Sequence, residues 1–312
     1  MMSDPPLTPN PSPPAGRGEN WRSHSVGYLA QVACTWEVLA RKAGNVCPGR
    51  EFPDLTVNDF LVSAAAIAPV LDEAPRHPLG VTILRCIEAT RRVVNTNTNL
   101  GIVLLLAPLC SVPMNEHFNS GLKCMLDDVT VEDTRNTFAA IRLASPGGLG
   151  KATDQDVHSE PTLPLRKVME LARERDLIAR EYSNGFLRVR GYADDIAKAT
   201  QTHQFVERAI IEVHLQLLCW KPDSLIVRKA GADTAEEVRL GAKQIQEAGG
   251  LDTKLGRYCF VEFDRWLRQE NHVRNPGTTA DLIAAAIFVA LREKMISIDA
   301  PFVWDDHPFN SQ

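Results

Sequence analysis

A run of five small amide and hydroxyl side chains separates two apolar segments of the chain. Residues 93–101 read VVNTNTNLG, and apolar helical patterns lie on both sides, at Val81–Val94 and Ile102–Leu106. A surface turn needs only one or two Asn or Thr residues, because these side chains hydrogen-bond their own backbone. Five of them between two core segments predict the wall of a polar pocket.

Four further connections combine Gly or Pro with amides, carboxylates or cations. They are residues 41–50 followed by Asp54, residues 180–186, residues 222–229 and residues 271–281. Taken singly, their residues have ordinary interpretations: Asn45 beside Gly44 is a turn residue, and Arg228 with Lys229 is a solvated helix end. A plain helical bundle does not need five loops of this chemistry, so together they favour a binding site.

This set of side chains suits a polyanionic substrate such as a nucleotide. Cationic side chains and helix N-termini bind phosphates, and glycine lets backbone N–H groups approach them. The candidate nucleotide-binding residues are Lys42, Asn45, Asn97, Thr98, Asn99, Arg180, Arg228, Lys229, Asn275, Gly277 and Thr278. No Walker A pattern is present, which argues against an ordinary P-loop phosphoryl transferase.

Carboxylates in the same connections could serve beside phosphates. One or two carboxylates commonly share a Mg²⁺ ion with phosphate oxygens, and a carboxylate can also act as a general base. The candidate metal ligands are Asp54, Glu181, Asp223, Asp264 and Asp281. We expect at least two of the first four to lie close enough to share one ion, and we take Glu181, Asp54 and Asp223 as the catalytic candidates.

Helices must position these loops. Apolar residues recur at three- and four-residue spacing from Trp21 onward, which indicates amphipathic helices. Thr-x-x-Asp motifs that begin at Thr56, Thr130 and Thr278 mark helix starts, and the same spacing gives Asp281 a capping interpretation. Further helices are expected at 163–173, 193–218, 235–248 and 255–269. Regular strand alternation is missing, so residues 21–312 are predicted to form a single compact all-α domain of about ten helices.

Composition excludes several classes of protein. The 312-residue chain has a net charge of −5 and a pI near 5.9, which argues against a nucleic-acid partner. We expect no membrane partner and a cytoplasmic location, because no segment resembles a membrane span or a secretion signal. Seven scattered cysteines without C-x-x-C are predicted to be reduced. Residues 1–20 are rich in Pro and are predicted to form a disordered leader.

The loops resemble those of the triphosphoribosyl-dephospho-CoA synthase family, in order, from about Trp36 to Leu291. The matching motifs are Glu37-Val38, Lys42, Gly44, Pro48–Phe60, Asn97-Thr98 with Gly101, Glu181 with Gly185-Phe186, Pro222-Asp223 with the basic pair that follows, and Asn275–Leu282. The resemblance implies an all-α enzyme that uses ATP and Mg²⁺, joins the triphosphoribosyl group to 3'-dephospho-CoA and releases adenine. For this reaction we assign the phosphates to Lys42, Arg228 and Lys229, the sugar and phosphate oxygens to Asn97, Thr98 and Asn99, and the base or metal role to Glu181 or Asp54.

Several positions depart from the family pattern. The chain has Cys47 in place of an Asp, Asn99-Leu100 in place of His-Lys, and Arg228-Lys229 in place of His-Arg. These changes indicate a divergent branch similar to the archaeal-type members. Two alternatives therefore stay open: action on another nucleotide or a pterin-type substrate in one-carbon (tetrahydromethanopterin-type) cofactor biosynthesis, and a non-catalytic helical nucleotide-binding protein. The retained carboxylates favour an enzyme, and a homodimer stays open.

Overall fold

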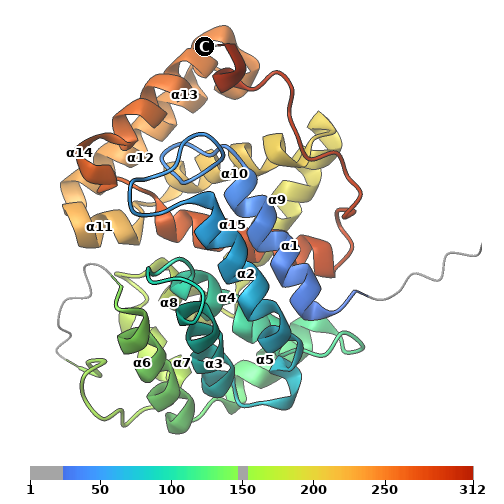
Figure 1. Cartoon of the computed structure of the whole chain (residues 1–312), viewed down its shortest axis with the longest axis vertical. Helices are drawn as coiled ribbons and strands as arrows, with labels where there is room; N and C mark the ends of the chain where they lie inside the picture. Colours follow the sequence, from blue (N-terminus) through green and yellow to red (C-terminus); the bar gives the residue numbers. More distant parts are fainter. Residues whose placement is uncertain (1–23, 147–153, 312) are drawn as a thin grey trace, which may run out of the picture.

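The computed structural model describes residues 24–146 and 154–311, and it is built from α-helices (Figure 1). The Pro-rich segment 1–20 lies outside the described residues. The α-helices are α1 (Val26–Leu39), α2 (Val57–Asp72), α3 (Leu79–Arg91), α4 (Leu100–Cys110), α5 (Phe118–Asp128), α6 (Val131–Ala144), α7 (Leu165–Ala172), α8 (Leu177–Asn184), α9 (Leu187–His203), α10 (Val206–Trp220), α11 (Ser224–Ala230), α12 (Ala232–Glu247), α13 (Lys254–Leu267), α14 (Gln269–His272) and α15 (Gly277–Arg292). In the described residues, extended pairing is limited to the isolated bridges Cys47–Arg50 and Phe52–Leu55. The all-α prediction is confirmed.

The described residues contain fifteen α-helices, more than the ten that we expected. Short helices account for part of the difference, because α8, α11 and α14 have eight residues or fewer and too few turns to show a clear period. The segment 193–218 is also two helices and not one. Gln204 ends α9 in the left-handed region with φ of 64°, and α10 starts two residues later.

All three predicted helix starts are confirmed, and two of them have the predicted cap. Thr56 with Asp59, and Thr130 with Asp133, form complete capping boxes at the starts of α2 and α6. The third start is near the predicted place, but its cap is absent. Helix α15 begins at Gly277 after Pro276 and receives no side-chain cap bond, so the capping interpretation of Asp281 is wrong. That carboxylate is available for another role.

Helices α4 and α15 form the centre of the core. Almost every residue of both helices is buried, which is why their sequences are apolar on all sides and show no amphipathic period. Helices α1 and α9 pack against α15, and α3 packs against α6 in the lower half of Figure 1. None of the described helices combines the length and apolar character that a membrane crossing requires. No disulfide links the described cysteines; Cys124 is exposed, and Cys34, Cys47, Cys86 and Cys110 are buried.

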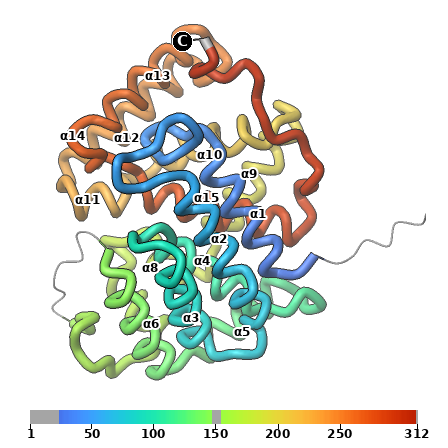
Figure 2. Tube along the Cα trace, in the orientation of Figure 1, coloured from blue at the N-terminus to red at the C-terminus, as the bar shows by residue number. Residues whose placement is uncertain are grey.

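The loop between α1 and α2 lies near α12, α13 and α14 (Figure 2), and one buried carboxylate of α13 binds it. Asp264 is fully buried and accepts hydrogen bonds from Gly44 N at 2.8 Å, Arg50 Nη1 at 2.5 Å and Arg268 Nε at 2.9 Å. The prediction of Asp264 as a metal ligand is therefore wrong, because two guanidinium groups and a backbone N–H already use both of its oxygens. Its role is to fasten the loop.

Asp264→Ala is expected to lower the free energy of unfolding by about 3–5 kcal/mol, the usual cost of removing one partner from a buried charged network. Urea denaturation measures the change. Glu262→Ala is the matched control on the same helix, because Glu262 pairs with Arg265 at the surface and exposed pairs contribute about 0–1 kcal/mol. Equal losses in the two variants would contradict the fastening role.

Candidate active site

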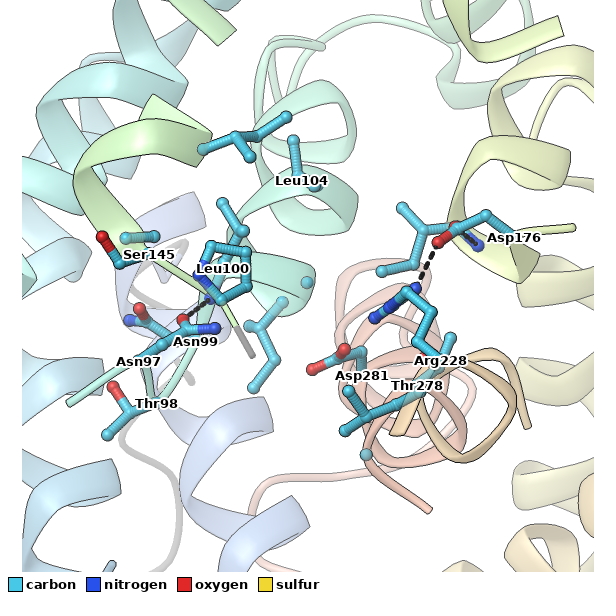
Figure 3. Close-up of a pocket in the computed structure, with 18 of the residues that line it drawn as sticks. Asn97, Thr98, Asn99, Leu100, Leu104, Ser145, Asp176, Arg228, Thr278 and Asp281 are labelled. Atoms are coloured by element: carbon cyan, nitrogen blue, oxygen red, sulfur yellow. Dashed lines mark hydrogen bonds and ion pairs between the residues drawn. The ribbon is translucent and has the colours of Figure 1, made fainter. Parts of the chain in front are cut away.

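A pocket of about 850 Å³ lies between the loops and helices that carry the polar motifs (Figure 3). Its walls come from the α1–α2 loop, the segment before α4, helices α6, α7 and α8, helix α11 and the start of α15. Its volume is near the upper end of the range of about 300–1,000 Å³ that is usual for small-molecule sites. The pocket can therefore hold more than one small ligand group.

The structure separates the predicted site residues into two groups. The residues that line the pocket are Asn45, Asp54, Asn97, Thr98, Asn99, Arg228, Lys229, Asn275, Gly277, Thr278 and Asp281. Lys42, Arg180, Glu181, Asp223 and Asp264 are not among the lining residues. The asparagine-threonine run thus forms a pocket wall, and it faces the basic pair from a distant part of the sequence.

Asn45, residues 95–99 and Asn275 form one side of the pocket, which we call the amide wall. It contains two hydrogen-bond acceptors without partners. Asn97 Oδ1 accepts from Leu100 N at 3.1 Å and so helps to start α4, and Asn99 donates through Nδ2 to Thr90 Oγ1 at 3.0 Å. Asn45 Nδ2 donates to Asn275 Oδ1 at 2.8 Å. The remaining oxygens, Asn45 Oδ1 and Asn99 Oδ1, are buried and have no hydrogen-bond partner in the described part of the chain. Unpaired buried acceptors are rare, so a small rotation of these two amides on binding would let a ligand supply the missing donor.

Arg228 and Lys229 form another side of the pocket, which we call the cationic wall, and one of these two cations is already in an ion pair. Arg228 Nη1 lies 2.7 Å from Asp176 Oδ2, and Asp176 Oδ1 caps α8 by accepting from Ile178 N at 2.9 Å (Figure 3). Lys229 is exposed and forms no ion pair with the other described residues. An incoming phosphate would therefore meet Lys229 directly, and it would compete with Asp176 for Arg228.

Glu37 brings a carboxylate from the apolar helix α1 to the pocket. Its side chain is buried, it lines the pocket, and its Oε1 lies 2.9 Å from Lys42 Nζ. Lys42 is fully buried, and it also donates to the backbone oxygens of Ala40 and Glu37. The assignment of Lys42 to phosphates is therefore wrong: its three donors are used inside the protein, and it holds Glu37 in place.

Asp281 supplies a second carboxylate to the pocket. Burial, the charge of Glu37 and the charge of Asp223 raise its pKa well above the ordinary value, and Arg228 partly offsets these effects. A β-carbon added to Gly101 would lie 1.9 Å from Asp281 Oδ2, so only glycine permits this approach of α4 to α15. The charge of Glu37 contributes to the raised pKa of Asp281, and both carboxylates line the same pocket.

Three other predicted residues have structural roles. Glu181 Oε2 accepts from Val189 N at 3.0 Å near the start of α9, and burial raises its pKa. Asp223 caps α11 through Oδ1 and accepts from Thr279 N at 2.7 Å through Oδ2. Arg180 pairs with Glu174 at 2.7 Å. The catalytic and metal assignments of Glu181 and Asp223, and the nucleotide assignment of Arg180, do not fit this placement.

The expectation that at least two of Asp54, Glu181, Asp223 and Asp264 share one ion gains no support from the structure. Glu181, Asp223 and Asp264 are bound to backbone N–H groups of three separate segments, so their oxygens are already used. In the described ranges, no three His, Cys, Asp or Glu residues come together as a metal site. Among the carboxylates that line the pocket, Glu37 and Asp281 are the ones that the core helices α1 and α15 supply. The sequence did carry a signal for Glu37, a charged residue among the apolar positions of a core helix.

Asp54 lies at the rim of the pocket. It is 70% exposed and lies 3.2 Å from His272 Nε2, while the His272 ring stacks on Phe52 at 4.1 Å. Three successive residues, 270–272, adopt left-handed φ values of 53°, 57° and 50°. Such backbone costs energy in non-glycine residues, and the contacts of Phe52 and Asp54 with His272 offset it. These contacts join the α1–α2 loop to α14 at the rim of the pocket.

The chain is similar to proteins of one family over most of its length. The model of the ATP:dephospho-CoA triphosphoribosyl transferase family matches residues 23–299. A relative from Malonomonas rubra, named "Probable 2-(5''-triphosphoribosyl)-3'-dephosphocoenzyme-A synthase", is 25% identical over 293 residues, which cover 85% of this chain and 86% of the relative.

Two further comparisons agree. A relative with the same name from Pseudomonas savastanoi pv. phaseolicola is 25% identical over 163 residues, and the match spans only 53% of that protein. The crystal structure of a candidate triphosphoribosyl-dephospho-CoA synthase from Archaeoglobus fulgidus has 27% identity and a TM-score of 0.60, and the match covers 76% of this chain and all of that chain. The family model covers far more than half of the sequence, and the described residues have the matching all-α fold. The chain therefore belongs to the ATP:dephospho-CoA triphosphoribosyl transferase family.

Proposed function

We propose that this protein transfers the triphosphoribosyl group of ATP to the ribose 2'-hydroxyl of 3'-dephospho-CoA and releases adenine. The observation that carries the proposal is a single pocket that combines a cationic wall, unpaired amide acceptors and two carboxylates from separate helices. Family membership supports the same reaction. Small nucleotide substrates of this kind fit an enzyme that acts in the cytoplasm.

The reaction needs the triphosphate to be fixed so that C1' of its ribose faces the acceptor. Lys229 is free to bind a phosphate, and Arg228 can turn from Asp176 to a second one. Phosphate oxygens are acceptors only, so they cannot satisfy Asn45 Oδ1 and Asn99 Oδ1. Ribose hydroxyls can donate to these oxygens, so we assign the sugar to the amide wall. Positioning of this kind can lower a barrier by about 7–11 kcal/mol in well-oriented systems.

Glu37 is the general base in this scheme. Its Oε1 is held by Lys42, which leaves Oε2 to accept the proton of the attacking hydroxyl. The C1'–N9 bond of ATP breaks as the new C1'–O bond forms, and the departing adenine takes up a proton. Glu37 replaces Glu181 and Asp54 as the proposed base. The Glu181 carboxylate accepts from a backbone N–H near the start of α9, and Asp54 lies at the exposed rim.

We assign the divalent metal of the reaction as Mg²⁺, with Asp281 as its protein ligand. The donor set fits: Mg²⁺ binds one or two carboxylates together with phosphate oxygens, and Asp281 lines the same pocket as the cations assigned to the triphosphate. Burial and the nearby charges of Glu37 and Asp223 raise the pKa of Asp281, and a bound cation would offset these effects. A bound Mg²⁺ would neutralise phosphate charge, while Asp281 would hold it beside the substrate.

A different acceptor is the second candidate. The departures from the family pattern at Asn99 and Leu100 lie on the pocket wall, where they would contact a substrate. A pterin-type acceptor of one-carbon metabolism is therefore the alternative. Chromatographic detection of free adenine from ATP, Mg²⁺ and dephospho-CoA tests the main proposal. If ATP binds but no adenine appears, the synthase reaction is excluded and pterin-type acceptors are tested next.

Replacing Glu37 and Lys42 together tests the base. Glu37→Gln alone would leave the Lys42 ammonium group buried and unpaired, whereas the double variant Glu37→Gln/Lys42→Gln removes both charges and should fold. We expect its affinity for ATP to stay within about threefold of that of the unaltered protein. Its rate of adenine release should fall by a factor on the order of 100 or more. Calorimetric titration and adenine chromatography measure the two quantities.

Glu181→Gln is the matched control for the base. This change weakens a helix start, so it should lower the melting temperature while leaving the turnover of folded enzyme within a few-fold. The base assignment fails if the double variant turns over normally, or if the control loses turnover as strongly without losing stability.

Asp281→Asn should stabilise the metal-free protein at neutral pH. The folded state raises the pKa of Asp281, so it binds more protons than the unfolded state above the ordinary carboxyl pKa of about 3.8. Ionisation therefore lowers stability as the pH rises through the raised pKa. The neutral amide has no such penalty. We expect a melting temperature higher by a few degrees at pH 7, on the scale of about 2–4 °C per kcal/mol, and a smaller difference near pH 4.

The same variant tests the metal assignment through a thermal shift. Mg²⁺ with ATP should raise the melting temperature of the unaltered protein more than ATP with EDTA does, since ligands that bind only the folded state stabilise it. The increment due to Mg²⁺ should disappear in Asp281→Asn. An unchanged increment would remove Asp281 from the metal site.

A further inference from the structure

The pocket has a second end whose chemistry differs from that of the polar walls. Helices α4, α6 and α7 line it with apolar side chains, and we call this end the apolar compartment: Leu104, Phe138, Ile141, Leu165, Met169 and Ala172. In Figure 3, Leu104 lies away from Thr98 and Thr278, on the far side of the pocket. These side chains are buried or half-buried, so a ligand group bound here would meet a largely apolar surface.

Helix α7 is built to face this compartment. Leu165, Val168, Met169 and Ala172 line the pocket, while Arg166, Lys167 and Glu170 form surface ion pairs on the other side of the helix. Only Leu165 and Met169 are buried by the protein itself. The rest of the apolar face is turned toward the pocket, so covering it with an uncharged ligand group would be favourable by about 25 cal/mol per Å² of apolar surface.

A triphosphate cannot occupy the apolar compartment, because charges removed from water without partners are strongly unfavourable. It belongs with Lys229 and Arg228 at the other end of the pocket. The compartment must therefore take an uncharged part of a substrate. Phe138 and Met169 favour a planar ring, since aromatic edges and thioether sulfur atoms both make favourable contacts with aromatic faces.

Arg175 indicates how such a substrate continues out of the compartment. It lines the pocket three residues after Ala172, it is exposed, and it makes no ion pair with the other described residues. A guanidinium group without a partner at this place suits a phosphate or diphosphate that follows the uncharged ring. The ring would thus lie inside, with an anionic linker at the rim.

We propose that the apolar compartment binds the adenine ring of the acceptor, with Arg175 on the acceptor diphosphate; this rests on the proposed function. The attacking 2'-hydroxyl is on the carbon next to the one that carries this adenine, so a hydroxyl placed at Glu37 brings the ring into the same pocket. The pantetheine arm lies beyond the diphosphate and extends toward solvent. The adenine of ATP leaves during the reaction, and it does not occupy the enclosed compartment.

Ala172→Trp tests this assignment by filling the compartment. Calorimetric titration should show the affinity for dephospho-CoA falling at least tenfold, with the affinity for ATP unchanged within twofold. Lys167→Trp is the matched control, because it adds the same side chain to the solvent face of the same helix, and it should change neither affinity. Arg175→Met is a second variant at an exposed position. It should lower the affinity for dephospho-CoA several-fold and leave the affinity for ATP unchanged.

The opposite results would overturn the assignment. If Ala172→Trp lowers the affinity for ATP and leaves that for dephospho-CoA unchanged, the compartment binds the donor nucleotide. If 4'-phosphopantetheine, which lacks adenine, displaces dephospho-CoA from the unaltered protein and loses binding in Ala172→Trp, the arm is the occupant. If neither nucleotide is affected, the compartment is no part of the acceptor site.

The two proposals can fail separately. Adenine release by the unaltered enzyme, together with an unchanged KM for dephospho-CoA in Ala172→Trp, would keep the proposed function and reject the acceptor subsite. Selective loss of dephospho-CoA binding in Ala172→Trp, without adenine release by the unaltered protein, would keep the subsite and reject the reaction.

Discussion

The buried ion pair between Glu37 and Lys42 is the constraint on which the site depends. A carboxylate on a core helix is costly to bury, and a lysine that is fully buried is equally costly, so neither would be stable there alone. At 2.9 Å each provides the charge that the other needs. The bonds from Lys42 to the backbone of α1 use its other donors, so Glu37 is fixed at the pocket wall and cannot fold back into the core.

Most acidic residues that seemed suited to chemistry are used to hold backbone. Asp223, Asp264 and Glu181 each accept from main-chain N–H groups at the start of a helix or in a loop. A buried N–H without a partner is costly, and a carboxylate is the strongest acceptor available to it. These carboxylates determine where the loops lie. The loops in turn place the amide and cationic side chains that line the pocket.

The pocket side chains, in contrast, are left incompletely satisfied. Asn45 and Asn99 each have an unpaired oxygen, Asp281 has a raised pKa, and the left-handed turn at residues 270–272 stores backbone strain at the rim. Such features lower stability and are expected where a ligand completes the structure. Asp223, Asp264 and Glu181 meet backbone N–H groups, whereas Asp281 faces the pocket. The packing of α1, α4 and α15 decides which partner each carboxylate meets.

The sequence by itself determined the all-α class, two of the three capped helix starts, and the polar wall at residues 95–99, because periodicity, capping boxes and runs of amides act over a few residues. The same spacing that caps α2 through Asp59 occurs at Asp281, where no cap forms. Which carboxylate meets a backbone N–H and which faces the pocket was decided only by tertiary structure. Glu37, Lys42 and Asp281 are far apart along the chain, and the packing of α1 against α15 decides which of their charges are paired inside the protein and which face the pocket.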